Sequence, residues 1–563
     1  MTEARLSTSI PVISGAAGGA PSATKSAAAS GVPPADKSDP AGSSLARTAR
    51  TSTPENLAEQ LVLPLDDFLA RPSSPGIART RRVFANRDLR MSGITWVGFD
   101  MDYTLAIYDQ PQMDRLSIDA TVDKLVRRGY PHFIVDAPQE VDFAVRGLLI
   151  DKRFGHILKM DRYKHVSKGY HGFRQLTKDE LRALYHAKKL RPATPRYHWI
   201  DTLYALSEVS LYAALVDALE KRGQAVDYAK LFTDIRECID EAHRDGTILD
   251  AVVSDLPRFV RRDPDLALTL HKLRSAGKKL FLLTNSRWSY TEKMMTYLLG
   301  GAMLEYPSWR NYFDIVVVAA TKPAFFQERR PLLERVFSDG EGHVRPATFP
   351  LERGKVYEGG NLHDFERALG VSGDQVLYVG DHIYGDILRS KKESVWRTAM
   401  IIQELETEVA AHQACADDFD QSMNLEDARE HLEDDLRFYQ ARYKELARAI
   451  EHGEGKNGDA KTNGARVAEL EAERGRVKRS VERVRGRLRT VEAELLALER
   501  RIDSRFHPFW GSLLKEASEE SSFGAQVEEY ACVYTSRVSN LLAYSPQQHY
   551  RGARDVMAHE QGA

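Results

Sequence analysis

Four short apolar runs, each followed at once or within a few positions by polar or glycine residues, recur along the chain. They span residues 94–99, 279–283, 315–318 and 375–379. Runs of this length, bounded by turn residues, are typical of strands buried in a parallel sheet. Just before the second run, in residues 263–277, leucines recur at helical spacing and the segment ends in glycine. A helix followed directly by a buried strand is typical of an α/β unit. The pattern predicts an α/β fold built on a doubly wound parallel sheet.

The connection between the first two runs is unusually long. About 175 residues separate them, whereas a single crossover needs a dozen or a few more. We therefore expect a cap domain, mainly helical, inserted over residues 111–260 between two parts of the core, residues 57–110 and 261–421. Residues 198–260 carry the clearer helical pattern, and residues 143–172 mix short apolar runs with turns.

Three further segments differ from this core. Residues 1–56 are crowded with Ala, Ser, Gly, Pro and Thr and predict a disordered tail, because they cannot bury enough surface to offset chain entropy. Residues 422–504 carry two series of apolar positions in steps of three and four around residues 453–464, which predicts an antiparallel coiled-coil hairpin. We expect a packing arm, with oligomerisation or docking as the alternative. Residues 505–563 are expected to form a helical segment packed on the core.

Composition narrows the classes of function. The 563 residues, 42% of them hydrophobic, are enough for a large core and more than one structural unit. Lys and Arg total 79 against 81 Asp and Glu, so no excess of positive charge favours a nucleic-acid or membrane partner. Three cysteines fit neither a disulfide framework nor a zinc site, and no apolar run approaches the roughly 20 residues that cross a bilayer. The N-terminus also lacks a secretion signal, so we expect a cytoplasmic protein.

The candidate chemistry follows the expected strands, at the edge of the sheet where α/β proteins bind ligands. The first strand runs into Asp100 and Asp102. One carboxylate can attack phosphorus, and a second can protonate the departing oxygen and later deprotonate water. Pairs of aspartates are common in loops, so this motif alone is weak evidence.

The other three strands supply complementary groups. Thr284 and Asn285 follow the second strand, and their hydroxyl and amide can donate to phosphoryl oxygens or, equally well, cap a helix. Lys322 follows the third strand, where its charge could neutralise both phosphate and nucleophile. The fourth strand leads into Asp381 and Asp386, and Mg²⁺ is usually held by one or two carboxylates plus substrate phosphate. Together these residues predict a magnesium-dependent phosphoryl-transfer site.

In chain order, these groups match the four motifs of the haloacid dehalogenase (HAD) superfamily. Residues 99–105, FDMDYTL, and 380–392, GDHIYGDILRSKK, further resemble the cytosolic purine 5′-nucleotidase family, in particular its bacterial members. The likeness covers about residues 80–405 and resumes near residue 506. The hairpin and the N-terminal tail lie outside it.

The resemblance assigns roles to the strand-end residues. It implies that Asp100 becomes phosphorylated and that Asp102 acts first as acid and then as base. It implies that Mg²⁺ sits between Asp100, the backbone carbonyl of Asp102 and Asp381, with Asp386 in the same site. The transferred phosphoryl group would be held by Thr284, Asn285 and Lys322.

The family binds the nucleoside through its cap. Arg236, Asp240 and His243 are spaced four and three residues apart, which puts them on one helix face. Such a stripe is more often a solvated face, but the resemblance makes the three residues candidates for base and ribose contacts. Tyr204 stands where the family stacks an aromatic ring on the purine.

These inferences predict a 5′-nucleotidase that hydrolyses nucleoside 5′-monophosphates, with purines as the expected bases, through an aspartyl phosphate. A nucleoside phosphotransferase or another small-molecule phosphatase of the same fold is the alternative. A non-catalytic scaffold acting through the hairpin is a second alternative, and it predicts eroded carboxylates, whereas Asp100, Asp102, Asp381 and Asp386 are all present. We expect a homo-oligomer without nucleic-acid or membrane partners.

Overall fold

A computed structural model describes residues 76–553 of the chain, except residues 141, 187–189, 338–341, 389–393 and 454–459. The tail expected over residues 1–56 lies outside the described residues. Among the helices of the described part, none is long and apolar enough to cross a membrane.

Ten strands form one mixed sheet in the order β1-β20-β17-β16-β3-β11-β12-β15-β13-β14. Its centre consists of β3 (Trp96–Phe99), β11 (Lys279–Leu283), β12 (Ile315–Val318) and β16 (Val376–Gly380). Strand β3 pairs in parallel with both β11 and β16, and β12 pairs in parallel with β11. The four apolar runs therefore form the parallel centre of the sheet, which confirms the predicted α/β class.

Both faces of this sheet are covered. Along β11, Leu280 and Leu282 belong to one apolar cluster, whereas Phe281 and Leu283 belong to another. Alternate side chains of a strand point to opposite faces, so the two clusters are the two covered faces of the sheet. The covering helices include α9 (Leu266–Ser275), α10 (Trp288–Leu299) and α12 (Leu362–Leu369). Continuous burial explains why these strands have no alternating polar positions.

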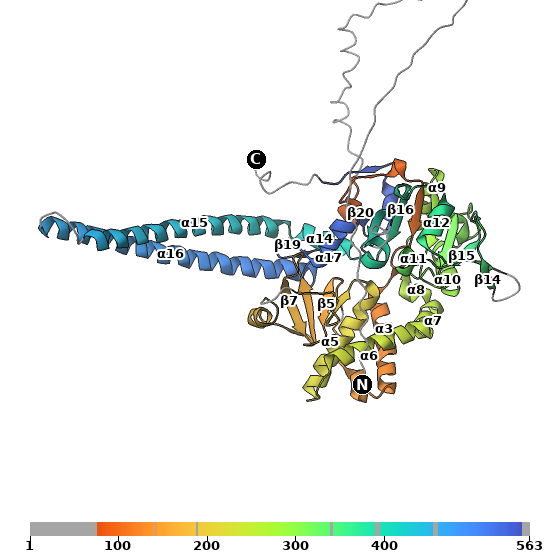
Figure 1. Cartoon of the computed structure of the whole chain (residues 1–563), viewed down its shortest axis with the longest axis horizontal. Coiled ribbons are helices and arrows are strands. Elements are labelled where there is room, and N and C mark those ends of the chain that lie inside the picture. The colour runs from red at the N-terminus through yellow and green to blue at the C-terminus, as the bar shows by residue number, and fades with distance from the viewer. Residues whose placement is uncertain are drawn as a thin grey trace, which may run out of the picture. The chain divides into compact units, whose positions relative to one another are not determined.

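The flanking strands come from distant parts of the chain. On one side the sheet continues through β17 (Arg397–Ile401), β20 (Val533–Thr535) and β1 (Phe84–Ala85). On the other it continues through β15 (Val356–Gly359), β13 (Leu332–Val336) and β14 (His343–Pro346). The C-terminal segment, expected to be helical, thus contributes strand β20 as well as helix α17 (Ser522–Tyr530) (Figure 1).

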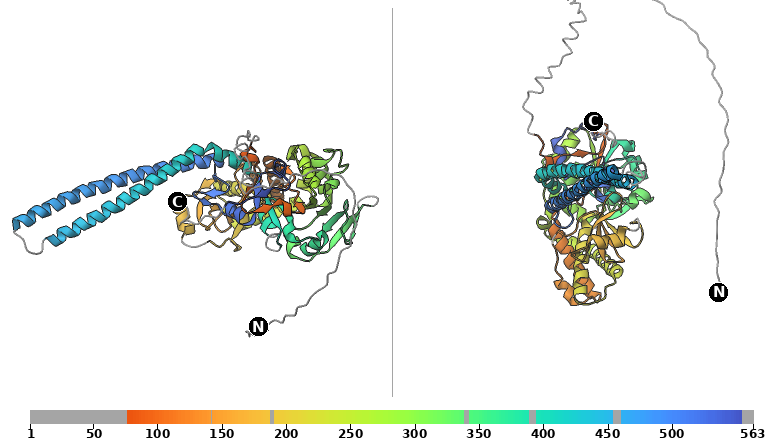
Figure 2. Two further views of the ribbon diagram at one scale, coloured as in Figure 1. Left: turned by 90° about the horizontal axis from the view of Figure 1, so that it is seen from above. Right: turned by 90° about the vertical axis from the view of Figure 1, so that its left-hand side faces the viewer.

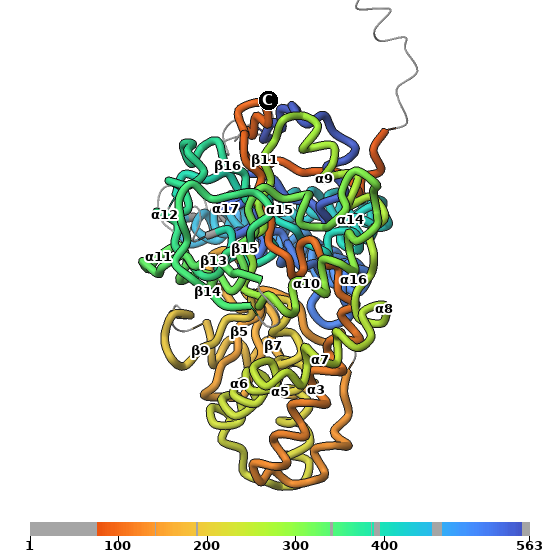
Figure 3. Tube along the Cα trace, turned by 90° about the vertical axis from the view of Figure 1, so that its right-hand side faces the viewer, coloured from red at the N-terminus to blue at the C-terminus, as the bar shows by residue number. Residues whose placement is uncertain are grey.

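The insertion after β3 combines helices with a second sheet (Figure 3). Its main helices are α3 (Gln110–Arg127), α5 (Leu206–Lys221), α6 (Tyr228–Arg244) and α7 (Thr247–Ser254). Its antiparallel sheet, in the order β8-β7-β6-β5-β9, comprises β5 (Leu148–Asp151), β6 (His156–Met160), β7 (Val166–His171), β8 (Arg174–Gln175) and β9 (Tyr197–Ile200). This sheet was not predicted, because its two- to six-residue strands carry too few positions to establish a period.

Two long helices, α15 (Ala416–Gly453) and α16 (Ala460–Phe506), lie side by side (Figures 1 and 2). Ion pairs join Arg442 to Glu473 and Arg501 to Asp418, so the helices run antiparallel. Their facing apolar positions are buried, among them Leu446, Val477, Val481, Val484, Leu495 and Leu498. Helix α16 begins at Ala460, inside the segment expected to form the turn.

Candidate active site

The strand-end residues singled out from the sequence gather at one edge of the central sheet. Asp100 directly follows β3, Thr284 follows β11 and Asp381 follows β16. Because β3 lies between β11 and β16 and is parallel to both, the carboxyl ends of the three strands meet. Asp386 reaches the same place from the helical turn Ile383–Leu388.

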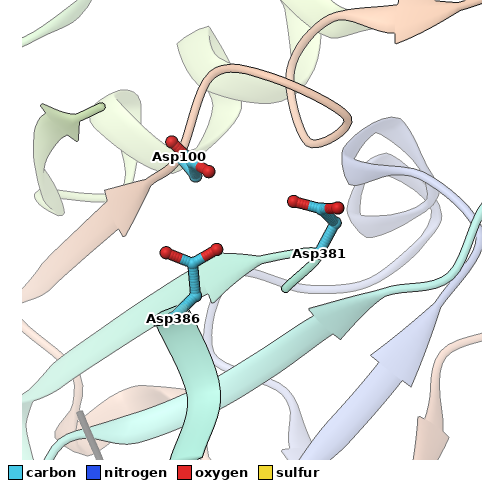
Figure 4. A group of neighbouring side chains, drawn as sticks. All are labelled: Asp100, Asp381 and Asp386. Carbon is cyan, nitrogen blue, oxygen red and sulfur yellow. The ribbon is translucent and has the colours of Figure 1, made fainter. Parts of the chain in front are cut away.

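Three carboxylates converge there (Figure 4). Asp100, Asp381 and Asp386 each present a carboxylate oxygen, and these oxygens lie within 4.8 Å of one another. The three residues are buried, with exposed fractions of 8%, 5% and 2%. Like charges this close repel strongly in a medium poor in water, so the arrangement favours a nearby cation.

Lys322 supplies part of the required positive charge. Its Nζ lies 2.9 Å from Oδ1 of Asp100 and 2.6 Å from Oδ1 of Asp386, and it donates to the Tyr378 hydroxyl at 2.8 Å. One ammonium cannot balance three carboxylates. Burial, and then the charge of Asp386, accordingly raise the pKa of Asp381 to about 7. Burial also raises the pKa of Asp100 well above its usual value, against the opposing charge of Lys322.

The donor set fits a small divalent cation. It consists of hard carboxylate oxygens with a net negative charge, and Mg²⁺ favours such oxygens. The described residues offer this group without a histidine or cysteine, so a softer metal such as zinc is not favoured. The Asp102 side chain does not belong to this group, and the resemblance implies only its backbone carbonyl as a metal ligand.

The Asp102 carboxylate points instead into a group of hydroxyls. Its Oδ1 accepts a hydrogen bond from Tyr108 at 2.6 Å, and its Oδ2 accepts one from Ser286 at 2.6 Å. The Tyr108 hydroxyl also lies 2.8 Å from that of Tyr290. Burial raises the pKa of Asp102, and the hydrogen bonds from Ser286 and Tyr108 oppose the rise. An aspartate with a raised pKa is suited to donating and accepting a proton near neutral pH.

Tyr108, Tyr290 and Ser286 were not among the predicted site residues. Ser286 directly follows the Thr284-Asn285 pair, so its place next to this motif could have indicated it. Tyr290 lies 182 positions from Tyr108 along the chain, and no local pattern connects the two residues.

Asn285 fixes the backbone of the loop that carries Lys322. Its Nδ2 donates to the Lys322 carbonyl at 3.0 Å, and its Oδ1 accepts from the Lys322 amide at 2.6 Å. The predicted donation from Asn285 to a phosphoryl oxygen would compete with the first of these bonds. Thr284 is fully buried, and its hydroxyl accepts from the Ser286 amide at 3.1 Å.

Arg146, a buried arginine of the insertion that was not among the predicted site residues, supports the loop that presents Asp381. Arg146 is 2% exposed, and its Nη1 donates to the Asp381 carbonyl at 2.9 Å. Its Nε and Nη2 donate to the two carboxylate oxygens of Glu404 at 2.8 and 2.6 Å. A bidentate pair of this kind fixes orientation as well as charge. Arg146 therefore ties the insertion to the backbone of the loop that presents Asp381.

Arg236, Asp240 and His243, the residues expected to contact the nucleoside, lie on one helix, α6, as predicted. Their surroundings differ. The Arg236 guanidinium is engaged with Oε2 of Glu208 at 3.1 Å and Nε2 of His198 at 2.8 Å. Asp240 is exposed and His243 is half-buried. The structure therefore places the stripe on one helix but does not give its three residues a common partner.

Tyr204 links this helix to the strand-end residues. Its ring lies edge-on to His243, with centroids 5.6 Å apart, and edge-on to Tyr103 at 4.7 Å. Burial dominates and raises the pKa of the Asp102 carboxyl, whereas the Tyr204 side chain lowers it. Tyr204 therefore contacts the expected base-binding helix and influences the candidate acid–base residue.

Comparisons with known proteins agree with the strand-end motifs. The profile of the 5′ nucleotidase family matches residues 83–562. A 5′-nucleotidase domain-containing protein of Dictyostelium discoideum is 29% identical over 486 residues, which are 85% of this chain and 74% of that protein. The 5′-nucleotidase domain-containing protein 2 of Rattus norvegicus is 32% identical over 353 residues, 61% of this chain and 62% of that protein. This chain thus matches less than two thirds of the rat protein's length.

Among solved structures, a predicted phosphoglycolate phosphatase from Haemophilus somnus aligns with a TM-score of 0.23 and 13% identity. The alignment covers 55% of this chain and 86% of that one.

Proposed function

Because this chain belongs to the 5′-nucleotidase family, we propose that it hydrolyses nucleoside 5′-monophosphates with Mg²⁺, through a phosphorylated Asp100. Family membership and the fold support phosphohydrolase activity in general. The observation that carries the specific proposal is the buried group Asp100, Asp381 and Asp386 with Lys322 between two of its members.

The first half-reaction uses the two aspartates of the first motif. An Asp100 oxygen attacks phosphorus, and the bond from phosphorus to the ribose 5′ oxygen breaks. Asp102 donates its proton to that leaving oxygen, so the nucleoside departs neutral. Lys322, held against Asp100 at 2.9 Å, stabilises the negative charge on the transferred phosphoryl group.

The second half-reaction restores the enzyme. Asp102, now ionised, takes a proton from water, and the resulting hydroxide attacks phosphorus and releases Asp100 with inorganic phosphate. Tyr108 and Ser286 hold the Asp102 carboxylate during both proton transfers. Asp100, Asp381 and Asp386 would hold Mg²⁺, which when bound would shield the anionic nucleophile from the anionic substrate.

The insertion would select the nucleoside. Arg236, Asp240 and His243 of α6 would contact base and ribose, and the Tyr204 ring would lie against a purine. The link from Tyr204 to His243 and to Asp102 supports this assignment, because a base held by α6 would then lie next to the reacting phosphate.

Rapid-quench mass spectrometry of the full chain during turnover of a nucleoside monophosphate tests the proposal. We expect phosphate on the peptide that contains Asp100, and we expect Asp100→Asn to lose both the phosphate and several orders of magnitude in kcat. Removal of metal by EDTA should abolish turnover, and added Mg²⁺ should restore it. Activity that persists in EDTA, or in Asp100→Asn, would overturn the mechanism.

A further inference from the structure

Two tyrosine hydroxyls form a chain with the Asp102 carboxylate. Tyr108 ends strand β4 (Ile107–Tyr108), and its hydroxyl lies 2.6 Å from Oδ1 of Asp102. Tyr290 lies in the first turn of α10, and its hydroxyl lies 2.8 Å from that of Tyr108. Both tyrosines are buried, with exposed fractions of 2% and 5%. The catalytic steps described above use Tyr108 and give no role to Tyr290.

The number of protons fixes the direction of these hydrogen bonds. A carboxylate only accepts, and a hydroxyl donates one proton. Burial raises the pKa of both tyrosines, so each hydroxyl keeps its proton. Tyr108 donates its proton to the ionised Asp102, so Tyr290 must be the donor in the bond between the two tyrosines. The chain of hydrogen bonds therefore runs from Tyr290 through Tyr108 to Oδ1 of Asp102.

One segment of the protein acts on both oxygens of this carboxylate. Ser286, in the connection between β11 and α10, donates directly to Oδ2 of Asp102 at 2.6 Å. Tyr290, four residues further along, acts on Oδ1 through Tyr108. The Tyr108 ring packs against that of Tyr103, with centroids 4.7 Å apart. Ring packing therefore sets where the Tyr108 hydroxyl lies, and Tyr290 sets the direction in which its proton points.

We propose that Tyr290 is a positioning residue for the acid–base step, because its hydrogen bond directs the proton of Tyr108 toward Asp102. The inference rests on the proposed function, in which Asp102 protonates the leaving oxygen. As the bond from phosphorus to that oxygen breaks, the oxygen gains the proton of Asp102, and Asp102 becomes a carboxylate. Hydrogen bonds already directed at the forming charge stabilise the transition state. A hydroxyl that accepts a hydrogen bond is itself a stronger donor, so Tyr290 adds to this stabilisation.

A purely structural role for the Tyr290 hydroxyl predicts a different result. Tyr290→Phe keeps the buried ring and removes only the hydroxyl. If the hydroxyl only contributes to packing and stability, its loss affects all substrates alike. If it acts through Asp102, the loss depends on how much the leaving group needs a proton. An alkoxide needs one, whereas 4-nitrophenolate is stable enough to leave without it.

The test measures kcat/KM of the full chain with Mg²⁺ on benzyl phosphate and on 4-nitrophenyl phosphate. This ratio reports the half-reaction in which the leaving group departs. Neither substrate has a nucleoside, so base binding does not enter the comparison. We expect Tyr290→Phe to lower kcat/KM roughly fivefold on benzyl phosphate, the effect of about one hydrogen bond. On 4-nitrophenyl phosphate we expect a change of less than about twofold.

Two further variants sharpen the test. In a Tyr108→Phe background, Tyr290→Phe should cause no additional loss on benzyl phosphate, because the chain of hydrogen bonds is already broken. Tyr297→Phe is the matched control in the same helix. The Tyr297 hydroxyl donates at 3.2 Å to the carbonyl of Val260, the residue of β10 (Val260–Arg261) that pairs with Tyr108. The control also loses one hydrogen bond, but it should keep kcat/KM on both substrates.

Three results from Tyr290→Phe would overturn the proposal, namely equal losses on the two substrates, no loss on benzyl phosphate, or a further loss in the Tyr108→Phe background. A loss on benzyl phosphate alone in Tyr297→Phe would overturn it as well.

Asp102→Asn distinguishes this proposal from the proposed function. It should lower kcat/KM on benzyl phosphate far more than on 4-nitrophenyl phosphate. If it does not, Asp102 is not the acid, and both proposals fail. If it does while Tyr290→Phe has no effect, only the role of Tyr290 is wrong.

Discussion

Replacing Lys322 by methionine separates the electrostatic role of the site from its packing. The change removes the ammonium that lies 2.9 Å from Asp100 and 2.6 Å from Asp386 but keeps most of the apolar stem. The Lys322 side chain is 3% exposed, so neither water nor salt can replace the lost charge. The carboxylates of the site would then face one another without their counter-charge.

Two free energies change as a result. Removing one partner of a buried ion pair costs about 3–5 kcal/mol of folding stability. Removing one group that stabilises transition-state charge costs about 3–4 kcal/mol, or roughly 10²–10³ in kcat. Added Mg²⁺ should recover part of the stability, because an ion that binds only the folded chain shifts the unfolding equilibrium. It should not recover kcat, because the contact of Lys322 with the transferred phosphoryl group is lost.

The assay is kcat on a small aryl phosphate together with thermal unfolding, each with and without Mg²⁺. Lys278→Met is the matched control, because Lys278 is also buried but donates only to the backbone carbonyls of Met91 and Ile94. The control should lose stability and keep kcat. If Lys322→Met keeps kcat within a few-fold of the unmodified chain, or if both variants lose it equally, the assigned role of Lys322 is wrong.

Three further perturbations concern the insertion. Asp240→Ala should raise KM for a nucleoside monophosphate by roughly tenfold, the loss of about one good hydrogen bond, and leave aryl phosphate hydrolysis unchanged. Tyr204→Phe should lower kcat on both substrates, because the Tyr204 side chain shifts the pKa of Asp102. Equal losses from Asp240→Ala on both substrates would mark the α6 stripe as structural. Burial raises the pKa of Glu208 from 4.5 to about 7, so the stability of the unmodified chain should fall as pH rises between these values. Glutamine does not titrate, so the melting temperature of Glu208→Gln should rise relative to that of the unmodified chain as the pH increases from 5 to 8. A difference in melting temperature that does not change with pH would contradict the reasoning.

The sequence alone determined the centre of the fold and the polar residues at its edge. Apolar runs of four to six residues bounded by turns admit few structures other than buried parallel strands, and chain order then sends their carboxyl ends to one side. That logic was enough to bring Asp100, Lys322, Asp381 and Asp386 into one hypothesis, and the structure places them in contact range. It was equally enough for the two helices of the hairpin, whose apolar period extends over many turns.

Only the tertiary structure decided how those residues are supported. The hydrogen bond from Ser286 to Asp102, the contact of Tyr290 with Tyr108, the hydrogen bond from Arg146 to the Asp381 carbonyl and the contact of Tyr204 with Tyr103 each join residues more than a hundred positions apart. The pattern of apolar positions in a sequence indicates whether one segment is a helix or a strand. It does not indicate which elements pack against each other. The five-stranded sheet of the insertion was not predicted because its strands of two to six residues are too short to establish a period. The strand ends therefore supply the groups that we propose to react, while long-range packing sets the orientation and the pKa of these groups.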